Sequence, residues 1–130
     1  MRGKQKFYFR SFVDRVIGHP EEISDEDFDV YAAAYGTDSQ LRAGFEMYRA
    51  FPQDISDNQV DRGPLPVPVL LAFGELSNAP LLDLVADGLK AAGVAGVKIS
   101  VIEGSGHFPA EEQPDQLAAA ITTFIDSIGA

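Results

Sequence analysis

Two apolar runs in the second half of the chain constrain its fold more than any other feature. Residues 67–73 read VPVLLAF and residues 97–102 read VKISVI, which is the composition of buried strands. Residues 81–92 between them have helical periodicity, and Pro114 suits the first turn of a closing helix over residues 114–128. Strand, helix, strand and helix in this order predict a βαβα unit, with two parallel strands and a right-handed crossover.

The first half of the chain is predicted to be helical. Large apolar side chains recur at helical spacing over residues 7–17, and Gly18 with Pro20 ends that segment. A capping-box sequence that begins at Ser24 predicts a second helix, which stops near Gly36. The sequence up to this point therefore predicts two short helices.

A third helix opens at residues 37–40 and carries large apolar side chains towards one side. Pro52 is expected to close or kink this helix, since proline cannot donate a backbone hydrogen bond. The Gly-Pro-Leu-Pro stretch at residues 63–66 then reads as a linker or strand entrance. We therefore predict a helical segment over residues 1–62 and an α/β segment over residues 63–130.

Composition argues against several classes of function. The chain has 130 residues, which fits one domain, and 45% of them are hydrophobic, which is enough for a core. It has no cysteine, so disulfides and thiolate sites are excluded. The net charge of −10 argues against nucleic acid and anionic membranes as partners. No apolar stretch approaches the roughly 18 residues of a spanning helix and no secretory signal is evident, so we expect a soluble, cytoplasmic protein.

Charged residues are unevenly distributed along the chain. Five of the ten Lys and Arg residues lie within the first fifteen positions, and acidic residues cluster over residues 21–29 and 111–115. Runs of charge are most often solvated helix faces. We therefore interpret both acidic clusters as solvent-facing rather than as binding sites.

The strand predicted at residues 67–73 has an open edge. Its sequence is apolar on both faces, as in a central strand, yet the chain offers it one clear neighbour. An exposed hydrophobic edge strand promotes aggregation unless something covers it. We therefore expect this sheet to be part of a larger one, completed by a homo-oligomer or by a missing N-terminal half.

The carboxyl ends of the two strands are the place to look for a site. Ligands of open α/β sheets bind outside the carboxyl ends of the strands. Glu75 lies in the loop that follows the first strand, and His107 lies in the Gly-Ser-Gly-His loop that follows the second. A carboxylate and an imidazole are thus predicted at the same edge of the sheet.

The quoted segments resemble a known family. PVLLAFGE, and VIEGSGHFPAEEQPDQLAAAITTFI after it, resemble the last two core strands, the histidine loop and the final helix of an α/β-hydrolase. RGKQKFYFRSF and LRAGFEMYRAF are similar to the helical cap of the epoxide-hydrolase and dehalogenase branch. The resemblance implies an incomplete α/β-hydrolase fold, in which residues 1–62 form a cap-like segment and residues 63–130 form the C-terminal part of the core.

The resemblance also implies roles for three residues. His107 corresponds to the general base of a nucleophile–histidine–acid triad, and imidazole, with its ordinary pKa of about 6.5, suits that role. Glu75 is either the acid that orients the histidine or a residue that caps the loop; the family commonly places its acid where this chain has Ser77. Tyr48 corresponds to a cap tyrosine that donates to the substrate oxygen or leaving group, and the alternative is an aromatic residue of the core.

The 130 residues depart from the family in one important respect. They contain neither the nucleophile elbow nor the oxyanion-hole loop, and Ser105 belongs to the histidine loop rather than to an elbow. Whether the chain is an enzyme therefore stays open. One hypothesis is an epoxide-hydrolase-like protein that acts on a small-molecule substrate when a nucleophile-bearing half completes it. The other is a non-catalytic remnant that self-associates or binds another protein. Neither cofactor nor metal is expected.

Overall fold

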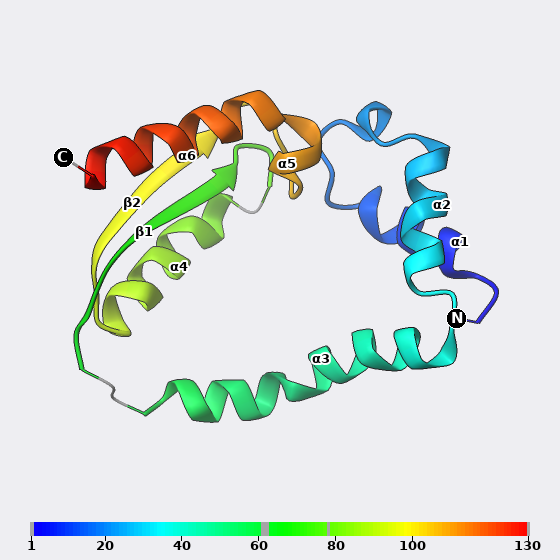
Figure 1. Cartoon of the computed structure of the whole chain (residues 1–130), viewed down its shortest axis with the longest axis horizontal. Helices are drawn as coiled ribbons and strands as arrows, with labels where there is room; N and C mark the ends of the chain where they lie inside the picture. The colour runs from blue at the N-terminus through cyan, green and yellow to red at the C-terminus, as the bar shows by residue number, and fades with distance from the viewer. Residues whose placement is uncertain (1, 61–62, 78, 130) are drawn as a thin grey trace. The chain divides into compact units, whose positions relative to one another are not determined.

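The computed structural model describes residues 2–60, 63–77 and 79–129 (Figure 1). Contacts divide the chain into two compact units. The first consists of Met1–Arg15 with Ile23–Asp61, and the second of Val16–Glu22 with Arg62–Ala130. The short segment Val16–Glu22 therefore packs with the α/β part of the chain, although helices of the first unit flank it in sequence.

The first unit contains helices α1 (Gln5–Val13), α2 (Asp25–Ala34) and α3 (Asp38–Asn58). Helix α1 ends at Val13, whereas the apolar periodicity of the sequence predicts a helix that continues to residue 17. The amide of Arg15 bonds the carbonyl of Phe12 at 3.2 Å, which tightens the last turn. The carbonyl of Val16 accepts a bond from a distant residue instead of continuing the helix.

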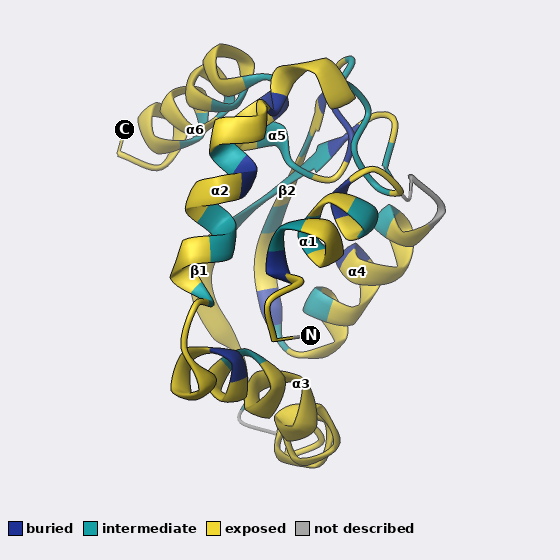
Figure 2. Cartoon of the chain, turned by 90° about the vertical axis from the view of Figure 1, so that its right-hand side faces the viewer, coloured by how far each residue is buried: buried dark blue, intermediate teal, exposed yellow. Residues whose placement is uncertain are grey.

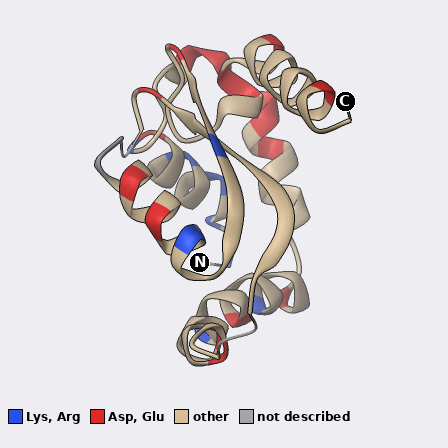
Figure 3. Cartoon of the chain, turned by 90° about the vertical axis from the view of Figure 1, so that its left-hand side faces the viewer, with Lys and Arg blue, Asp and Glu red and all other residues tan. Residues whose placement is uncertain are grey.

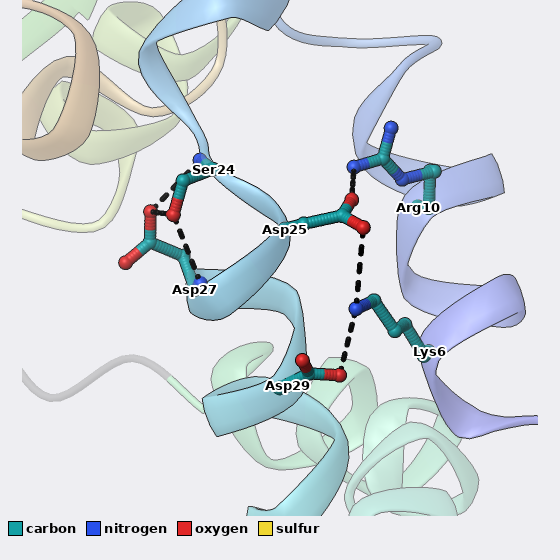
Figure 4. A network of polar contacts seen from close by, with 6 residues as sticks. All are labelled: Lys6, Arg10, Ser24, Asp25, Asp27 and Asp29. Carbon is teal, nitrogen blue, oxygen red and sulfur yellow. Dashed lines mark hydrogen bonds and ion pairs between the residues drawn. The ribbon is translucent and has the colours of Figure 1, made fainter.

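Helix α2 has the predicted capping box and is tied to α1 by ion pairs. The hydroxyl of Ser24 accepts a bond from the amide of Asp27, and the Asp27 carboxylate accepts one from the amide of Ser24 (Figure 4). Arg10 on α1 pairs with Asp25, and Lys6 lies 2.7 Å from a carboxylate oxygen of Asp29. These are exposed pairs, which contribute little individually.

Helix α3 continues for six residues beyond Pro52. Of the two expected effects of Pro52, closing the helix or kinking it, the first is therefore wrong. A capping box between Thr37 and Gln40 starts this helix. Leu41 is its one buried residue, and Figure 2 shows almost all of α3 in the exposed colour. The apolar side that the sequence predicts is present, but in the described residues it faces solvent.

The second unit is the predicted βαβα arrangement with two short additions. Its elements are η1 (Pro20–Glu22), β1 (Leu65–Gly74), α4 (Ala79–Ala91), β2 (Val94–Ile102), α5 (Pro109–Glu112) and α6 (Pro114–Ile128). The two strands are parallel neighbours, with Gly74 opposite Ile102 at their carboxyl ends. The parallel pairing and the closing helix that begins at Pro114 are therefore confirmed. The one-turn helix α5 is not predicted by the sequence pattern.

Strand β2 begins at Val94, three residues before the apolar run that predicts it, because the turn after α4 is short. Gly93 has a φ of +91°, and its carbonyl accepts a bond from the amide of Leu65 at 2.8 Å. Glycine adopts this left-handed conformation without strain, so the chain reverses at one residue. Val94 then pairs with Leu65, and the register shifts between Leu65 and Pro68.

Helices α4 and α6 lie on opposite sides of the strand pair and both contact each strand (Figure 1). Ala86, Val94 and Ile102 are buried between these layers. Among the described residues β1 pairs with β2 and with no second strand, so its other edge is open. Lys98 is the one charged residue in the two strands, which are drawn almost wholly tan in Figure 3. None of the described helices is both long and apolar enough to span a membrane.

Candidate active site at the histidine loop

The histidine loop, residues 103–108, follows β2 and is bound to the loop that follows β1. The amide of Glu75 donates to the carbonyl of Ile102 at 3.0 Å, and the amide of Leu76 donates to the carbonyl of Ser105 at 2.8 Å. These bonds extend the strand pairing beyond Gly74. As predicted from the topology, Glu75 and His107 therefore both lie at the carboxyl edge of the sheet.

The carboxylate of Glu75 binds the backbone of the histidine loop. Its Oε2 accepts a hydrogen bond from the amide of Gly104 at 2.9 Å. Gly104 has a φ of +67°, so the chain turns sharply at this position. In the described part of the chain, no hydrogen bond or ion pair joins Glu75 to the ring of His107. Of the two roles open for Glu75, this geometry corresponds to loop capping.

His107 is an exposed residue whose backbone is held by a hydrogen bond. Its amide donates to the carbonyl of Val16 at 3.0 Å. Its ring meets the ring of Phe108 edge-on, with centroids 5.0 Å apart. The structure therefore holds the main chain of this residue and leaves the imidazole accessible, which a proton-transferring group requires.

Glu112 on α5 is the polar centre of the site. Only 4% of this residue is exposed, and its carboxylate accepts four backbone hydrogen bonds. Oε2 accepts from Gly18 at 2.8 Å, from His19 at 3.1 Å and from Gly106 at 2.9 Å, and Oε1 accepts from Phe108 at 3.0 Å. Burial alone would raise the pKa of Glu112, but these four donors outweigh it and hold the pKa below its usual 4.5.

The prediction that residues 111–115 form a solvated face is wrong for Glu112, which is buried. The pattern of the acidic cluster is uniform, so composition alone does not distinguish Glu112 from its neighbours. Two of its donors, Gly18 and His19, lie more than ninety residues before it in the chain. One sequence feature does indicate this role. Glu112 lies in the first turn of a short helix, where backbone amides without a helical partner can donate to a carboxylate.

Close backbone contacts between glycines complete the site. A Cβ on Gly74 would lie 1.9 Å from the carbonyl oxygen of Gly106, and one on Gly106 would lie 2.2 Å from the amide nitrogen of Gly18. Each distance is too short for a side chain. Main chain therefore packs directly against main chain in three segments, which are the end of β1, the histidine loop and residues 16–19.

Two serines near the histidine each donate a hydrogen bond to a nearby backbone carbonyl. Ser105 is fully buried, and its hydroxyl donates to the carbonyl of Gly106 at 3.3 Å. Ser77, where the family commonly has its acid, donates its hydroxyl to the carbonyl of Gly74 at 2.8 Å. The buried hydroxyl of Ser105 fits a loop residue rather than an accessible nucleophile.

Tyr48 belongs to the other compact unit. It lies on α3, where 58% of the residue is exposed and its ring packs against Phe51 with centroids 5.3 Å apart. The structure thus brings Glu75 and His107 to one sheet edge, and it leaves Tyr48 on a solvent-facing helix of the first unit.

His19 also belongs to this site, since its amide donates to the carboxylate of Glu112. Its Nδ1 lies 3.1 Å from the carboxylate of Glu21, and this hydrogen bond raises the pKa of His19 above its ordinary 6.5, against partial burial that lowers it. The charge of Glu112 and the backbone of Gly104 raise the pKa further. The described residues contain no group of three or more His, Cys, Asp or Glu side chains placed to hold a metal.

Two solved structures are similar to this chain over nearly its whole length. No protein-family profile matches the chain, and no curated protein sequence matches it. Wild-type Cfl2 from Burkholderia cenocepacia aligns with a TM-score of 0.83 and 34% identity over 94% of this chain and 41% of its own. The epoxide hydrolase CorEH, without ligand, aligns with a TM-score of 0.74 and 20% identity over 95% of this chain and 43% of its own.

The chain thus spans less than half the length of either neighbour. That extent agrees with the C-terminal part of an epoxide hydrolase that the sequence resembles. Helices in the first unit and alternating helices and parallel strands in the second agree with it as well. The chain therefore has a partial α/β-hydrolase-like fold and resembles part of an epoxide hydrolase.

Proposed function

We propose that this chain supplies the histidine-bearing part of an epoxide-hydrolase-like site, in which His107 is the general base. The observation that carries the proposal is the exposed imidazole of His107 on a backbone that hydrogen bonds fix at the carboxyl edge of parallel strands. The name of the neighbour CorEH supports an epoxide as the substrate class. A carbon–halogen compound is the other class that the resemblance implies.

The proposed reaction has two steps. An aspartate from a nucleophile-bearing part attacks an epoxide carbon, the ring C–O bond breaks, and an ester forms. His107 then accepts a proton from water, whose oxygen attacks the ester carbonyl, and the acyl C–O bond breaks. The imidazolium returns the proton to the departing oxygen, which releases a diol, and the aspartic acid loses its proton to solvent. In this scheme the phenol of Tyr48 donates to the oxygen that leaves the carbon in the first step. Glu75 serves His107 through the loop backbone, because its carboxylate binds Gly104.

The 130-residue chain alone is expected to show no more than trace hydrolysis of epoxides, haloacids or activated esters. A general base without its nucleophile retains little of the effect that triad members have together. The purified chain is to be assayed with a chromogenic ester and a racemic epoxide. Robust turnover that disappears in Ser105→Ala would contradict the proposal, because it would make the buried serine a nucleophile.

The open edge of β1 favours a second candidate function, a protein-interaction module. Residues of a strand alternate in the edge to which they donate. The amide of Glu75 donates towards β2, so the amides of Leu71 and Phe73 are also directed to β2. The amides of Leu70 and Ala72 are then directed to the open edge, where a strand of another copy or of a second protein would pair.

Amide hydrogen exchange tests whether this edge is used. In a dilute, dissociated sample Leu70 and Ala72 should exchange much faster than Leu71 and Phe73, since they have no strand partner. At high concentration association should protect all four amides. Sedimentation shows the size of the particle under the same conditions. A folded monomer with the alternating pattern at every concentration would contradict self-association through β1.

A further inference from the structure

Glu112 binds the backbone on both sides of His107. Its Oε1 accepts from the amide of Phe108 and its Oε2 accepts from the amide of Gly106, so the histidine lies between two anchored peptide groups. The same Oε2 also accepts from Gly18 and His19. One carboxylate therefore fixes the histidine loop and fastens it to residues 16–19.

The fixed backbone leaves little freedom for the base. The amide of His107 itself donates to the carbonyl of Val16, so three consecutive amides, from residue 106 to residue 108, are engaged. Glycine at positions 18 and 106 allows the two backbones to touch with no side chain between them. Hydrogen bonds to a buried ionised carboxylate are stronger than those between neutral groups.

We propose that Glu112 is the positioning residue of His107, which holds the imidazole in place by clamping its loop to residues 16–19. The proposal rests on the proposed function in that His107 is the base. Glu112 does not touch the reacting atoms in this scheme. The ring of His19, which binds Glu21, is a titratable neighbour of the Glu112 carboxylate.

The clamp is tested by nuclear magnetic resonance on the full 130-residue chain. On acidification from pH 7, the amide protons of Gly18, His19, Gly106 and Phe108 should shift together, with one midpoint below 4.5, because Glu112 is their common acceptor. Glu112→Gln should abolish this common titration. Glu103→Gln, which removes an exposed carboxylate from the same loop, should preserve it.

The positioning role is read from the ring of His107. In the wild-type chain a nuclear Overhauser effect should join the rings of His107 and Phe108, whose centroids are 5.0 Å apart. In Glu112→Gln this effect should be lost and the ring signals should move towards those of an unstructured histidine. An unchanged ring contact in a folded Glu112→Gln chain that has lost the common titration would overturn the proposal.

If Glu112→Gln does not fold, the same measurement is made on the wild-type chain at a pH below the midpoint of the common amide titration, where Glu112 is neutral. There the ring contact should disappear together with the amide shifts, and its persistence would again overturn the proposal. None of these signals requires turnover, so failure of the clamp and failure of the proposed catalytic function are distinguishable.

Discussion

Gly74→Ala is expected to destabilise the second unit by about 3 kcal/mol or more, the size of effect that follows severe overpacking. The new Cβ would lie 1.9 Å from the carbonyl oxygen of Gly106 and 2.6 Å from that of Ser105. Both obstacles are backbone atoms, so neither can rotate away as a flexible side chain would. The histidine loop would have to leave the end of β1. Urea denaturation monitored by circular dichroism measures the loss.

Gly88→Ala is the matched control for this prediction. It adds the same methyl group inside helix α4, where nothing lies within 4 Å of the new Cβ. Alanine has the higher helix propensity, so this variant should be more stable by about 0.5–1 kcal/mol. Equal unfolding midpoints for the two variants would show that the stacked backbones at Gly74 contribute nothing to stability.

The sequence is sufficient to predict the elements whose signals are local. The apolar runs at residues 67–73 and 97–102 lie within β1 and β2, and the capping box at Ser24 starts α2. Pro114 begins α6 as predicted, because proline fits the first helical position. In each case neighbouring residues alone determine the outcome.

The errors in prediction have non-local causes. The helical pattern continues to residue 17, yet α1 ends at Val13 and the backbone of Val16 binds the histidine loop. Glu112 looks like a surface acid until the segment at residues 16–19 folds onto it. Pro52 stays within α3, although proline disfavours a helix interior. Tertiary contacts account for the first two of these outcomes.

The candidate site was partly predictable from the sequence for the same reason. Strand order alone places Glu75 and His107 at one edge of the sheet. The bond from Gly104 to the Glu75 carboxylate depends on the exact turn of the loop, which spacing does not determine. For that reason the sequence left two roles for Glu75 open, orientation of the histidine and capping of the loop.

His107→Ala should lower turnover by about a thousandfold once a nucleophile-bearing half from a related hydrolase completes the site, because general acid–base catalysis contributes about 10²–10⁴-fold. The variant removes the imidazole while the backbone bond to Val16 can persist, so folding should change little. His19→Ala is the control, since it removes the other histidine of the chain. It should lower turnover far less, because His19 binds Glu21 and is not the proposed base.

The most direct test of the account is the mass of the nucleophile-bearing polypeptide after the completed enzyme is mixed with excess epoxide. The proposed mechanism forms an ester before His107 acts, and His107 is needed to activate the water that cleaves it. With His107→Ala the polypeptide should gain the mass of one epoxide and keep it, while with the unsubstituted chain the adduct should not accumulate. An adduct that clears at the same rate in both would contradict the assignment of His107 as the general base.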